Sequence, residues 1–232
     1  MFSVELAAEF SHVCQLNIQH LTLNTPIMGK VRGKDWIREH VADAYVKRAR
    51  AEGMRSRAAY KLDEIAQRDR LLAPGMIVVD LGAAPGGWSQ VAAGRVGARG
   101  RVIALDTLEM RGLAGVTFIR GDFYDTTAVE TLERALGGDK ADLVLSDMAP
   151  NLSGIAASDQ ARALDLAELA LDFALKHLKP QGNFLVKLFQ GAGFESFLKT
   201  LRGCFATVAV RKPGASRSRS REVYLVGKGL RG

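Results

Sequence analysis

From Met76 to Lys228 the sequence alternates between short apolar runs and longer segments with helical spacing. Nearly continuous apolar runs are typical of strands that are buried on both faces of a sheet. Strands that alternate with helices predict the α/β class, with a doubly wound, mostly parallel sheet. We predict seven strands, from the runs MIVVDL, RVIALD, VTFIR, DLVLSD, NFLVKLF, ATVAVR and EVYLVG.

The segments between these runs are predicted to be helices. One of them repeats leucine and alanine three or four residues apart, which gives the apolar stripe of a helix packed on a sheet. The last two strand runs are separated only by KPGASRSRSR, so we expect them to form an antiparallel hairpin at one edge of the sheet. The four predicted helices span residues 87–96, 126–136, 159–178 and 194–202.

The part of the chain before the sheet is predicted to contain two helices. Residues 35–52 predict a helix that stops at Gly53, and Ser56 is a candidate N-cap for a helix that runs through Ile65. Residues 1–27 contain no lysine or arginine, unlike the sequence that follows. We interpret 1–27 as an N-terminal extension, either disordered or an upstream artefact of the choice of start site, and 28–232 as one domain.

The net charge of +7 is concentrated in two segments. Residues 28–61 hold ten basic and four acidic side chains, and residues 207–232 hold seven basic and one acidic. Two basic segments that flank a slightly acidic middle attract a polyanion such as nucleic acid. Charge kept for solubility would give the same pattern, so charge alone does not decide between these interpretations.

Several other classes of protein are excluded. With 47% hydrophobic residues the chain can bury a core, but no apolar run approaches the roughly 18 residues that a membrane span needs. The first residues lack the basic start of a secretory signal, so we expect a cytoplasmic protein. Cys14 and Cys204 have no partner at metal-ligand spacing, so we predict neither a disulfide nor a metal site.

The run VVDLGAAPGGWSQ, residues 78–90, places a glycine-rich loop between the first predicted strand and a helix. Ligands usually bind there in an open parallel sheet. A dinucleotide loop would read G-x-G-x-x-G, whereas three residues separate Gly82 from Gly86 here. The carboxylate of Asp80, two residues before Gly82, would repel a pyrophosphate but favour an ammonium or sulfonium group. S-adenosylmethionine carries both groups, so the loop favours it over a nicotinamide cofactor.

Two further acids follow the next two predicted strands. Asp106 ends the second strand, where a carboxylate can accept both hydroxyls of a ribose. Asp122 follows the third strand, where it can reach an adenine edge. Taken singly, each acid also fits a helix cap or a solvated loop residue, and Asp106 would suit a NAD enzyme as well.

Two charged residues beside apolar strands predict a reactive centre. Asp147 ends the fourth predicted strand, at the same edge of the sheet as the glycine loop. Lys187 lies inside the run FLVKLFQ, where a lysine needs either a partner or a path to solvent for its charge. Because the two strands are predicted neighbours, we assign a function to Lys187 together with Asp147.

The chain contains five ordered motifs that resemble those of the FtsJ-like ribosomal RNA 2′-O-methyltransferases: SRAAYKLDEI, DLGAAPGGWSQ, SDMAPNLSG, VKLFQG and RKPGASRSRSREVYLV. The resemblance runs from about Met28 to the end of the chain and implies a Rossmann-like class I methyltransferase fold. It implies a catalytic tetrad at Lys61, Asp147, Lys187 and Glu222. The cofactor contacts that it implies fall on Gly86, Trp88, Asp106, Asp122 and Asp147, in addition to Asp80 and Gly82 from the loop itself. Core packing is the alternative for Trp88.

The activity that the resemblance implies is S-adenosylmethionine-dependent methylation of the ribose 2′-hydroxyl of a uridine in large-subunit (23S) ribosomal RNA. The substrate would lie within an assembled or assembling large ribosomal subunit, and the enzyme would act as a monomer without a metal. A methyltransferase of transfer RNA or cap ribose is the alternative with the same chemistry. A nicotinamide-dependent oxidoreductase and a noncatalytic RNA-binding protein are the alternatives from other classes.

Lys187 has two possible roles in this chemistry. It can act as the general base for the 2′-hydroxyl, or as a charged group that orients the hydroxyl and stabilises developing negative charge. Burial and the charge of Lys61 favour the neutral amine, whereas Asp147 and Glu222 favour the ammonium. Phosphate contacts are expected from the two basic segments, at Lys47, Arg48, Arg50, Arg55, Arg57, Arg217, Arg219 and Arg221.

Overall fold

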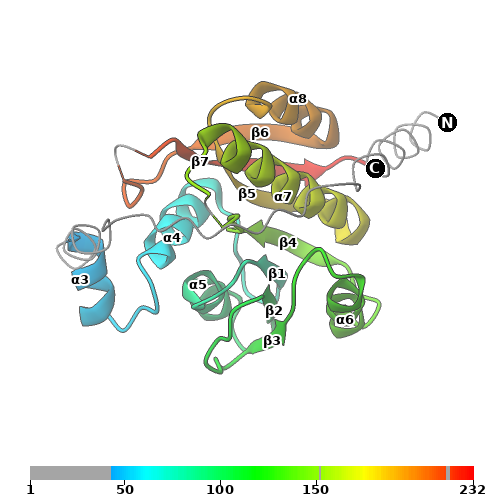
Figure 1. Cartoon of the computed structure of the whole chain (residues 1–232). Helices are drawn as coiled ribbons and strands as arrows, with labels where there is room; N and C mark the ends of the chain where they lie inside the picture. The colour runs from blue at the N-terminus through cyan, green and yellow to red at the C-terminus, as the bar shows by residue number, and fades with distance from the viewer. Residues whose placement is uncertain (1–42, 152, 218–219) are drawn as a thin grey trace. The chain divides into compact units, whose positions relative to one another are not determined.

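The computed structural model describes residues 43–151, 153–217 and 220–232. Within them, seven strands form one sheet in the order β3-β2-β1-β4-β5-β7-β6 (Figure 1). The strands from β3 to β5 pair in parallel, and β7 pairs antiparallel with both β5 and β6. The predicted fold class and C-terminal hairpin are therefore confirmed. The strands are β1 (Ile77–Leu81), β2 (Arg101–Asp106), β3 (Val116–Arg120), β4 (Ala141–Ser146), β5 (Leu178–Phe189), β6 (Phe205–Arg211) and β7 (Glu222–Leu230).

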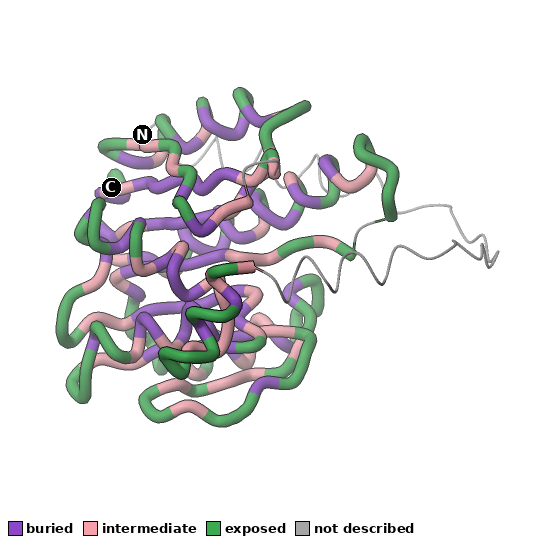
Figure 2. The backbone as a smooth tube through the Cα atoms, turned by 90° about the vertical axis from the view of Figure 1, so that its left-hand side faces the viewer, coloured by how far each residue is buried: buried purple, intermediate pink, exposed green. Residues whose placement is uncertain are grey.

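Helices cover both faces of the sheet, which explains why the strand runs are apolar almost throughout. Val79, Val144 and Val186 belong to one core, whereas their neighbours Val78 and Leu143 belong to the other. Successive side chains of a strand point to opposite faces, so both sets must be apolar. The first core is covered by α6 (Thr126–Leu136), α7 (Ala156–His177) and α8 (Phe194–Cys204), and the second by α4 (Ala58–Asp69) and α5 (Gly87–Val96). Figure 2 shows the buried segments of the backbone gathered in the interior, with exposed segments around them.

The strand order reverses between β1 and β4. The chain proceeds from β1 outward to β3 and then returns to place β4 on the other side of β1. Loops that leave the carboxyl ends of β1 and β4 therefore diverge, and this switch point is where open α/β sheets bind ligands. The two loops remain linked, because the backbone N–H of Asp147 donates to the carbonyl oxygen of Leu81 at 3.0 Å.

The helices before the sheet differ in detail from the prediction. Helix α3 (Ala44–Ala51) is capped by Asp43 and stops before Gly53, whose φ is +69°. Ser56 does not cap α4: the N-cap is Arg57, and the Ser56 hydroxyl is packed against Gly87 instead. The prediction of a Ser56 cap was wrong because this side chain serves the contact between α4 and α5. The predicted extension 1–27 and residues 28–42 lie outside the described residues.

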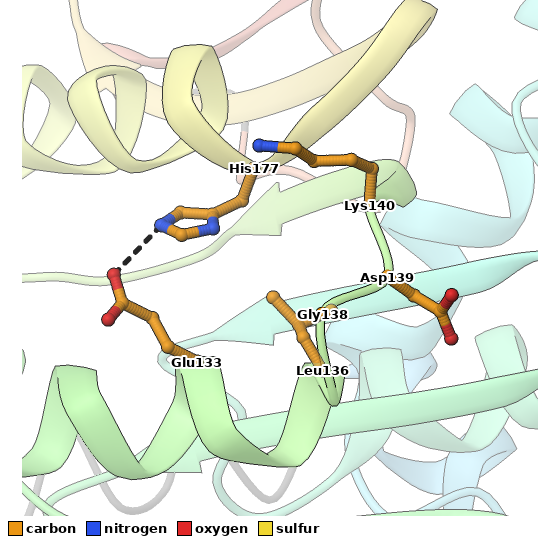
Figure 3. Close-up of a pocket in the computed structure, with 6 residues that line it drawn as sticks. All are labelled: Glu133, Leu136, Gly138, Asp139, Lys140 and His177. Carbon is orange, nitrogen blue, oxygen red and sulfur yellow. Dashed lines mark ion pairs between the residues drawn. The ribbon is translucent and has the colours of Figure 1, made fainter.

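A surface hollow lies at the amino end of β4, between the ends of α6 and α7 (Figure 3). Its lining residues are Glu133, Leu136, Gly138, Asp139, Lys140 and His177, and His177 Nε2 lies 3.0 Å from Glu133 Oε1. Asp147 follows the opposite end of β4, so the hollow and Asp147 lie at opposite edges of the sheet. Separately, none of the helices in the described ranges is long and apolar enough to cross a membrane.

Candidate active site

The loop that follows β1, residues 82–86, is shaped by its glycines, and we call it the cofactor loop. The backbone N–H groups of Gly82 and Ala83 both donate to the carbonyl oxygen of Leu105, at 2.9 and 3.2 Å. Gly82 has a φ of +76°, and a Cβ added to it would lie 2.7 Å from the backbone nitrogen of Met148. A side chain at Gly82 would therefore push the cofactor loop away from the segment that follows β4.

Asp80 lies beneath this loop with one carboxylate oxygen unused. The residue is fully buried, and its Oδ2 accepts a hydrogen bond of 2.6 Å from the Ser89 hydroxyl. Its Oδ1 has no hydrogen-bond partner among the described residues. Burial raises the pKa of Asp80 to about 7, outweighing the hydrogen bond from Ser89. A buried, unpaired carboxylate oxygen fits a ligand that brings a positive charge, so the donor set is compatible with S-adenosylmethionine.

Asp106 and Asp122 both stand at the carboxyl edge of the sheet, as predicted. Asp106 already accepts two backbone hydrogen bonds of 2.8 Å, one from Ala84 to Oδ2 and one from Leu108 to Oδ1. A carboxylate has about four lone-pair positions, so ribose hydroxyls can still bind it. Asp122 is exposed, and its Oδ1 accepts from the backbone N–H of Tyr124 at 3.0 Å. Asp106 thus shapes the cofactor loop, a role that the sequence did not predict.

The side chain of Trp88 belongs to the core rather than to an open site. It is 2% exposed, its Nε1–H donates to the carbonyl oxygen of Ala58 at 2.9 Å, and its ring centroid lies 5.6 Å from that of Tyr224. The indole therefore joins α5 to α4 and β7. Core packing, the alternative for this side chain, therefore accounts for the indole, and the contact of Trp88 with the cofactor stays a prediction.

The four predicted catalytic side chains lie together as two ion pairs. Lys61, on α4, pairs with Glu222, at the start of β7, with 2.6 Å between Nζ and Oε1. Lys187, on β5, lies 3.0 Å from Asp147 Oδ1 and also donates to the Asp147 carbonyl oxygen at 2.5 Å. All four side chains are less than one-fifth exposed. We call this group the tetrad.

The hydroxyl of Tyr224 connects the two ion pairs. It lies 3.0 Å from Lys61 Nζ, 3.0 Å from Glu222 Oε1 and 3.2 Å from Asp147 Oδ1. Burial, reinforced by the two carboxylates, raises the pKa of Tyr224 well above its usual value, so the phenol stays protonated as a donor. Sequence reasoning missed this residue, although it stands two positions after Glu222 and hence on the same face of the strand.

Strand pairing explains why these residues meet. Lys187 is paired directly with Tyr224 across the antiparallel β5–β7 ladder, so both side chains point to the face that α4 covers. Lys61 reaches them from α4. Burial raises the pKa of Glu222, but the charges of Lys61 and Lys187 outweigh this effect and hold it below its usual value. Glu222 is therefore an anion at neutral pH.

The predicted phosphate-binding residues divide into exposed and internally bonded groups. Lys47 and Arg50 are exposed on α3, and Arg221 is exposed before β7. Arg48 pairs with Glu52 at 2.8 Å, and Arg217 is half-buried. Arg219 lies outside the described residues.

Arg57 makes internal contacts in this structure, and its assignment to RNA binding stays a prediction. Its side chain is 15% exposed, and its guanidinium pairs with Asp43 and donates to the carbonyl oxygen of Ala215. This contact joins the segment before α4 to the loop between β6 and β7. The hydroxyl of Ser216 in the same loop lies 3.3 Å from Glu222 Oε1. The two basic segments therefore adjoin each other next to the tetrad.

The buried ion pairs of this arrangement can act on a polar group such as a hydroxyl. A buried lysine beside a carboxylate can orient a hydroxyl and stabilise negative charge on its oxygen. In the part of the chain that the structure describes, no group of three or more histidines, cysteines or acids is arranged to hold a metal ion.

Comparison with known proteins agrees with this chemistry. The model of a family described as FtsJ-like methyltransferase matches residues 54–230. A ribosomal RNA large subunit methyltransferase E from Cellvibrio japonicus (strain Ueda107) is 59% identical over 197 residues, covering 85% of this chain and 93% of that protein. The protein of the same name from Azoarcus sp. (strain BH72) is 62% identical over 198 residues, covering 85% of this chain and 97% of that protein.

Solved structures agree on the fold. The crystal structure of a Plasmodium falciparum protein, described as a ribosomal RNA methyltransferase, is 30% identical with a TM-score of 0.70. The match covers 77% of this chain and 99% of that one. A protein from Clostridium thermocellum described as an rRNA methylase is 16% identical with a TM-score of 0.51, which shows a shared fold alone.

Proposed function

Because this chain belongs to the FtsJ-like methyltransferase family and is an S-adenosylmethionine-dependent 2′-O-methyltransferase of large-subunit ribosomal RNA, we propose that the tetrad carries out the transfer. The proposal depends most on one observation: the Lys187–Asp147 ion pair lies where β4 ends, and the segment that follows β4 packs directly against the cofactor loop. The two binding regions therefore share the same edge of the sheet.

The cofactor site is assigned to the carboxyl ends of β1, β2 and β3. S-adenosylmethionine supplies an electrophilic methyl group on a sulfonium. Asp80 would provide the negative charge for the cationic part of the molecule, and Asp106 would accept the ribose hydroxyls. Gly82 and Gly86 would let the backbone approach closely, and Asp122 would reach the adenine.

Lys187 is the residue that acts on the ribose hydroxyl in this proposal. Two of its three N–H positions are directed to Asp147, one to the carboxylate and one to the carbonyl. This geometry leaves one N–H for the 2′-oxygen. As an ammonium, Lys187 orients the hydroxyl and stabilises negative charge on its oxygen. To act as the general base it must first pass a proton to Asp147, which lies within hydrogen-bond reach.

Lys61, Glu222 and Tyr224 hold this pair in place. Through Tyr224, the Lys61–Glu222 pair is bonded to the carboxylate of Asp147, which in turn fixes Lys187. In-line attack on a methyl group depends mainly on the alignment of the reacting atoms, so a rigid arrangement of buried charges contributes through positioning.

The RNA is expected to approach over the two adjoining basic segments. Lys47, Arg50 and Arg221 are exposed there and suit phosphate contacts. We propose a uridine as the target nucleotide, within an assembled or assembling large ribosomal subunit, with the enzyme acting as a monomer in the cytoplasm. RNA rather than DNA follows from the chemistry, because only RNA offers a 2′-hydroxyl.

Nucleoside mass spectrometry of ribosomal and transfer RNA from a deletion strain tests the substrate. We expect one 2′-O-methylated uridine to disappear from large-subunit RNA, and to return with the parent gene but not with a Lys187→Ala gene. Loss of a modification from transfer RNA alone would instead favour the alternative substrate, and an unchanged set of nucleosides would contradict both.

A further inference from the structure

Arg55 lies in the turn between α3 and α4, inside a basic segment, but its guanidinium is directed at main-chain carbonyls. Nη1 donates to the oxygen of Arg111 and Nη2 to the oxygen of Gly112, each at 2.6 Å. Nη1 also lies 3.4 Å from the carbonyl oxygen of Pro85. These carbonyls belong to the cofactor loop and to the loop that follows β2. One side chain therefore bridges both loops with charge-assisted hydrogen bonds.

Gln90 fixes the backbone from which Arg55 extends. Its Oε1 accepts from the backbone N–H of Arg55 at 2.9 Å, and its Nε2 donates to the carbonyl oxygen of Gly53 at 3.0 Å. Gln90 lies in α5, the helix that begins directly after the cofactor loop. Arg55 is thus held at both ends, by α5 at its backbone and by two loops at its guanidinium.

The contact between Arg55 and the cofactor loop is close. A Cβ added to Gly86 would lie 2.8 Å from Nη1 and 2.9 Å from Cδ of Arg55, and 2.7 Å from Sδ of Met110. Gly86 also has a φ of +104°, which side chains rarely tolerate. Glycine at this position therefore allows the positive φ of the turn and leaves room for the side chain of Arg55.

Asp106 also holds these two loops. Its carboxylate accepts backbone N–H groups of Ala84 and Leu108, whereas Arg55 donates to backbone carbonyls of the same segments, 83–86 and 107–112. Two side chains of opposite charge thus fix the two loops through opposite ends of their peptide groups. Asp106 is also the residue assigned above to the cofactor ribose.

We propose that Arg55 is a positioning residue for the methyl donor, which holds the cofactor loop and residues 107–112 in the shape that binds S-adenosylmethionine. This inference rests on the cofactor site assigned above. It replaces the expectation that Arg55 contacts an RNA phosphate, since a guanidinium bonded to three carbonyls must break these bonds to bind elsewhere. Arg55 and Gln90 together thereby link the basic segment before α4 to the cofactor site.

The test compares Arg55→Gln and Arg55→Lys with two matched controls. Arg95→Gln removes an arginine on α5 whose Nη2 lies 2.6 Å from Asp63, away from the loops. Arg50→Gln removes an exposed arginine of the basic segment. Each protein is titrated with S-adenosylmethionine by calorimetry and with target RNA at several salt concentrations, and kcat and KM are measured for both substrates.

We expect Arg55→Gln to weaken cofactor binding by about tenfold or more, because hydrogen bonds from a charged donor are lost. The KM for S-adenosylmethionine should rise more than kcat falls. The salt slope of RNA binding should match that of the parent. Arg55→Lys should recover part of the affinity, because an ammonium can reach one carbonyl but cannot span the fork. Arg95→Gln should behave like the parent protein.

Two results would overturn the proposal. Unchanged cofactor affinity with a shallower salt slope, as expected for Arg50→Gln, would make Arg55 a phosphate contact, since each phosphate contributes about 0.7 to 0.9 to that slope. A lower thermal midpoint of the ligand-free protein with unchanged cofactor affinity would make Arg55 a residue of general stability. Neither result affects the proposed function, which is tested separately by the parent protein's methylation of the RNA and by the Lys187→Ala variant.

Discussion

The cofactor loop and the tetrad are neighbours, but they satisfy their polar groups in different ways. The cofactor loop is held by backbone hydrogen bonds, and the acid beneath it, Asp80, keeps one buried oxygen without a partner among the described residues. In the tetrad every charged side chain is paired with another, and Tyr224 joins the two pairs. Among the described residues, one region thus keeps an unpaired acceptor, whereas the other pairs its charges internally.

This difference indicates where each region obtains its specificity. A buried carboxylate that lacks a partner gains most from a cationic ligand, so we expect the proposed cofactor site to select its ligand by charge. The charges of the tetrad already neutralise one another, so we expect the tetrad to select its substrate by geometry. The substrate hydroxyl must lie where the remaining N–H of Lys187 can donate to it. Mutations should accordingly change binding in the first region and turnover in the second.

The largest expected effect comes from Lys187→Ala. We expect methyl transfer to fall by at least the 10² to 10⁴ typical of a lost acid–base group, with S-adenosylmethionine binding close to that of the parent. Single-turnover methylation measures the rate of methyl transfer, and calorimetry measures the affinity for S-adenosylmethionine. If cofactor affinity fell as far as turnover, the division between the two regions would be refuted.

Lys187→Arg separates the two roles of Lys187. A guanidinium keeps its charge but does not give up a proton at neutral pH. Measurable turnover with normal affinity for both substrates would therefore exclude the general base and leave orientation and charge. An inactive variant that still binds both substrates would favour the base.

Asp106→Ala should have the next largest effect, on binding alone. Loss of the ribose acceptor, together with the two backbone N–H groups that the carboxylate holds, should weaken S-adenosylmethionine binding by about 1 to 3 kcal/mol, or roughly 5- to 150-fold. Asp139→Ala is the control, since Asp139 lies at the opposite edge of the sheet and pairs with Arg101. Equal dissociation constants for the two variants would remove Asp106 from the cofactor site.

Asp80 predicts a pH dependence of cofactor binding. The pKa of Asp80 in the folded protein, about 7, lies above its ordinary value of 3.8. The ligand-free protein therefore loses stability as the pH rises from about 4 to about 7. A cationic ligand prefers the ionised acid, so affinity should rise by up to about tenfold between pH 6 and pH 8. Calorimetry at pH 6 in two buffers of different ionisation enthalpy should show proton release, which Asp80→Asn should abolish. Equal release from both proteins would contradict the assignment.

The smallest predicted effect is that of Tyr224→Phe. The ring remains packed on Trp88, but the hydroxyl that joins the two ion pairs is lost. We expect kcat to fall about fivefold, the value of roughly one hydrogen bond, with unchanged cofactor affinity. A fall as large as that of Lys187→Ala would show that the hydroxyl takes part in the reaction rather than in positioning.

The sheet and the pairing of Asp147 with Lys187 could be predicted from the residues because their signals are local, whereas Lys61 and Glu222 were implied only by the family resemblance. Apolar runs reveal strands that are buried on both faces, and Lys187 is conspicuous as a charge inside such a run. Tyr224 gave no comparable signal, since a tyrosine in a strand suits any core. Its role depends on the meeting of β4, β7 and α4 around one hydroxyl, which depends on the tertiary structure.

The arginines show a second limit of sequence-based prediction. Charge density identified the basic segments, but a long side chain can turn inward or outward with little local preference. Arg57 and Arg55 turn inward, to carbonyls of Ala215 and of residues 85, 111 and 112. Ser56 likewise follows a packing contact with Gly87 rather than the capping pattern. Each of these outcomes depends on segments that are distant in the sequence.

The position of β7 between β5 and β6 has a consequence for protein synthesis. Glu222 and Tyr224 lie on this strand, the last one in the described sheet, and they complete a centre whose other members are translated much earlier. A nascent chain that has folded every element up to β6 still lacks the partner of Lys61 and leaves β5 without its antiparallel neighbour. Without Glu222 and Tyr224 the proposed catalytic centre is incomplete, so we expect a chain that stops before β7 to be inactive even when its cofactor loop is fully formed.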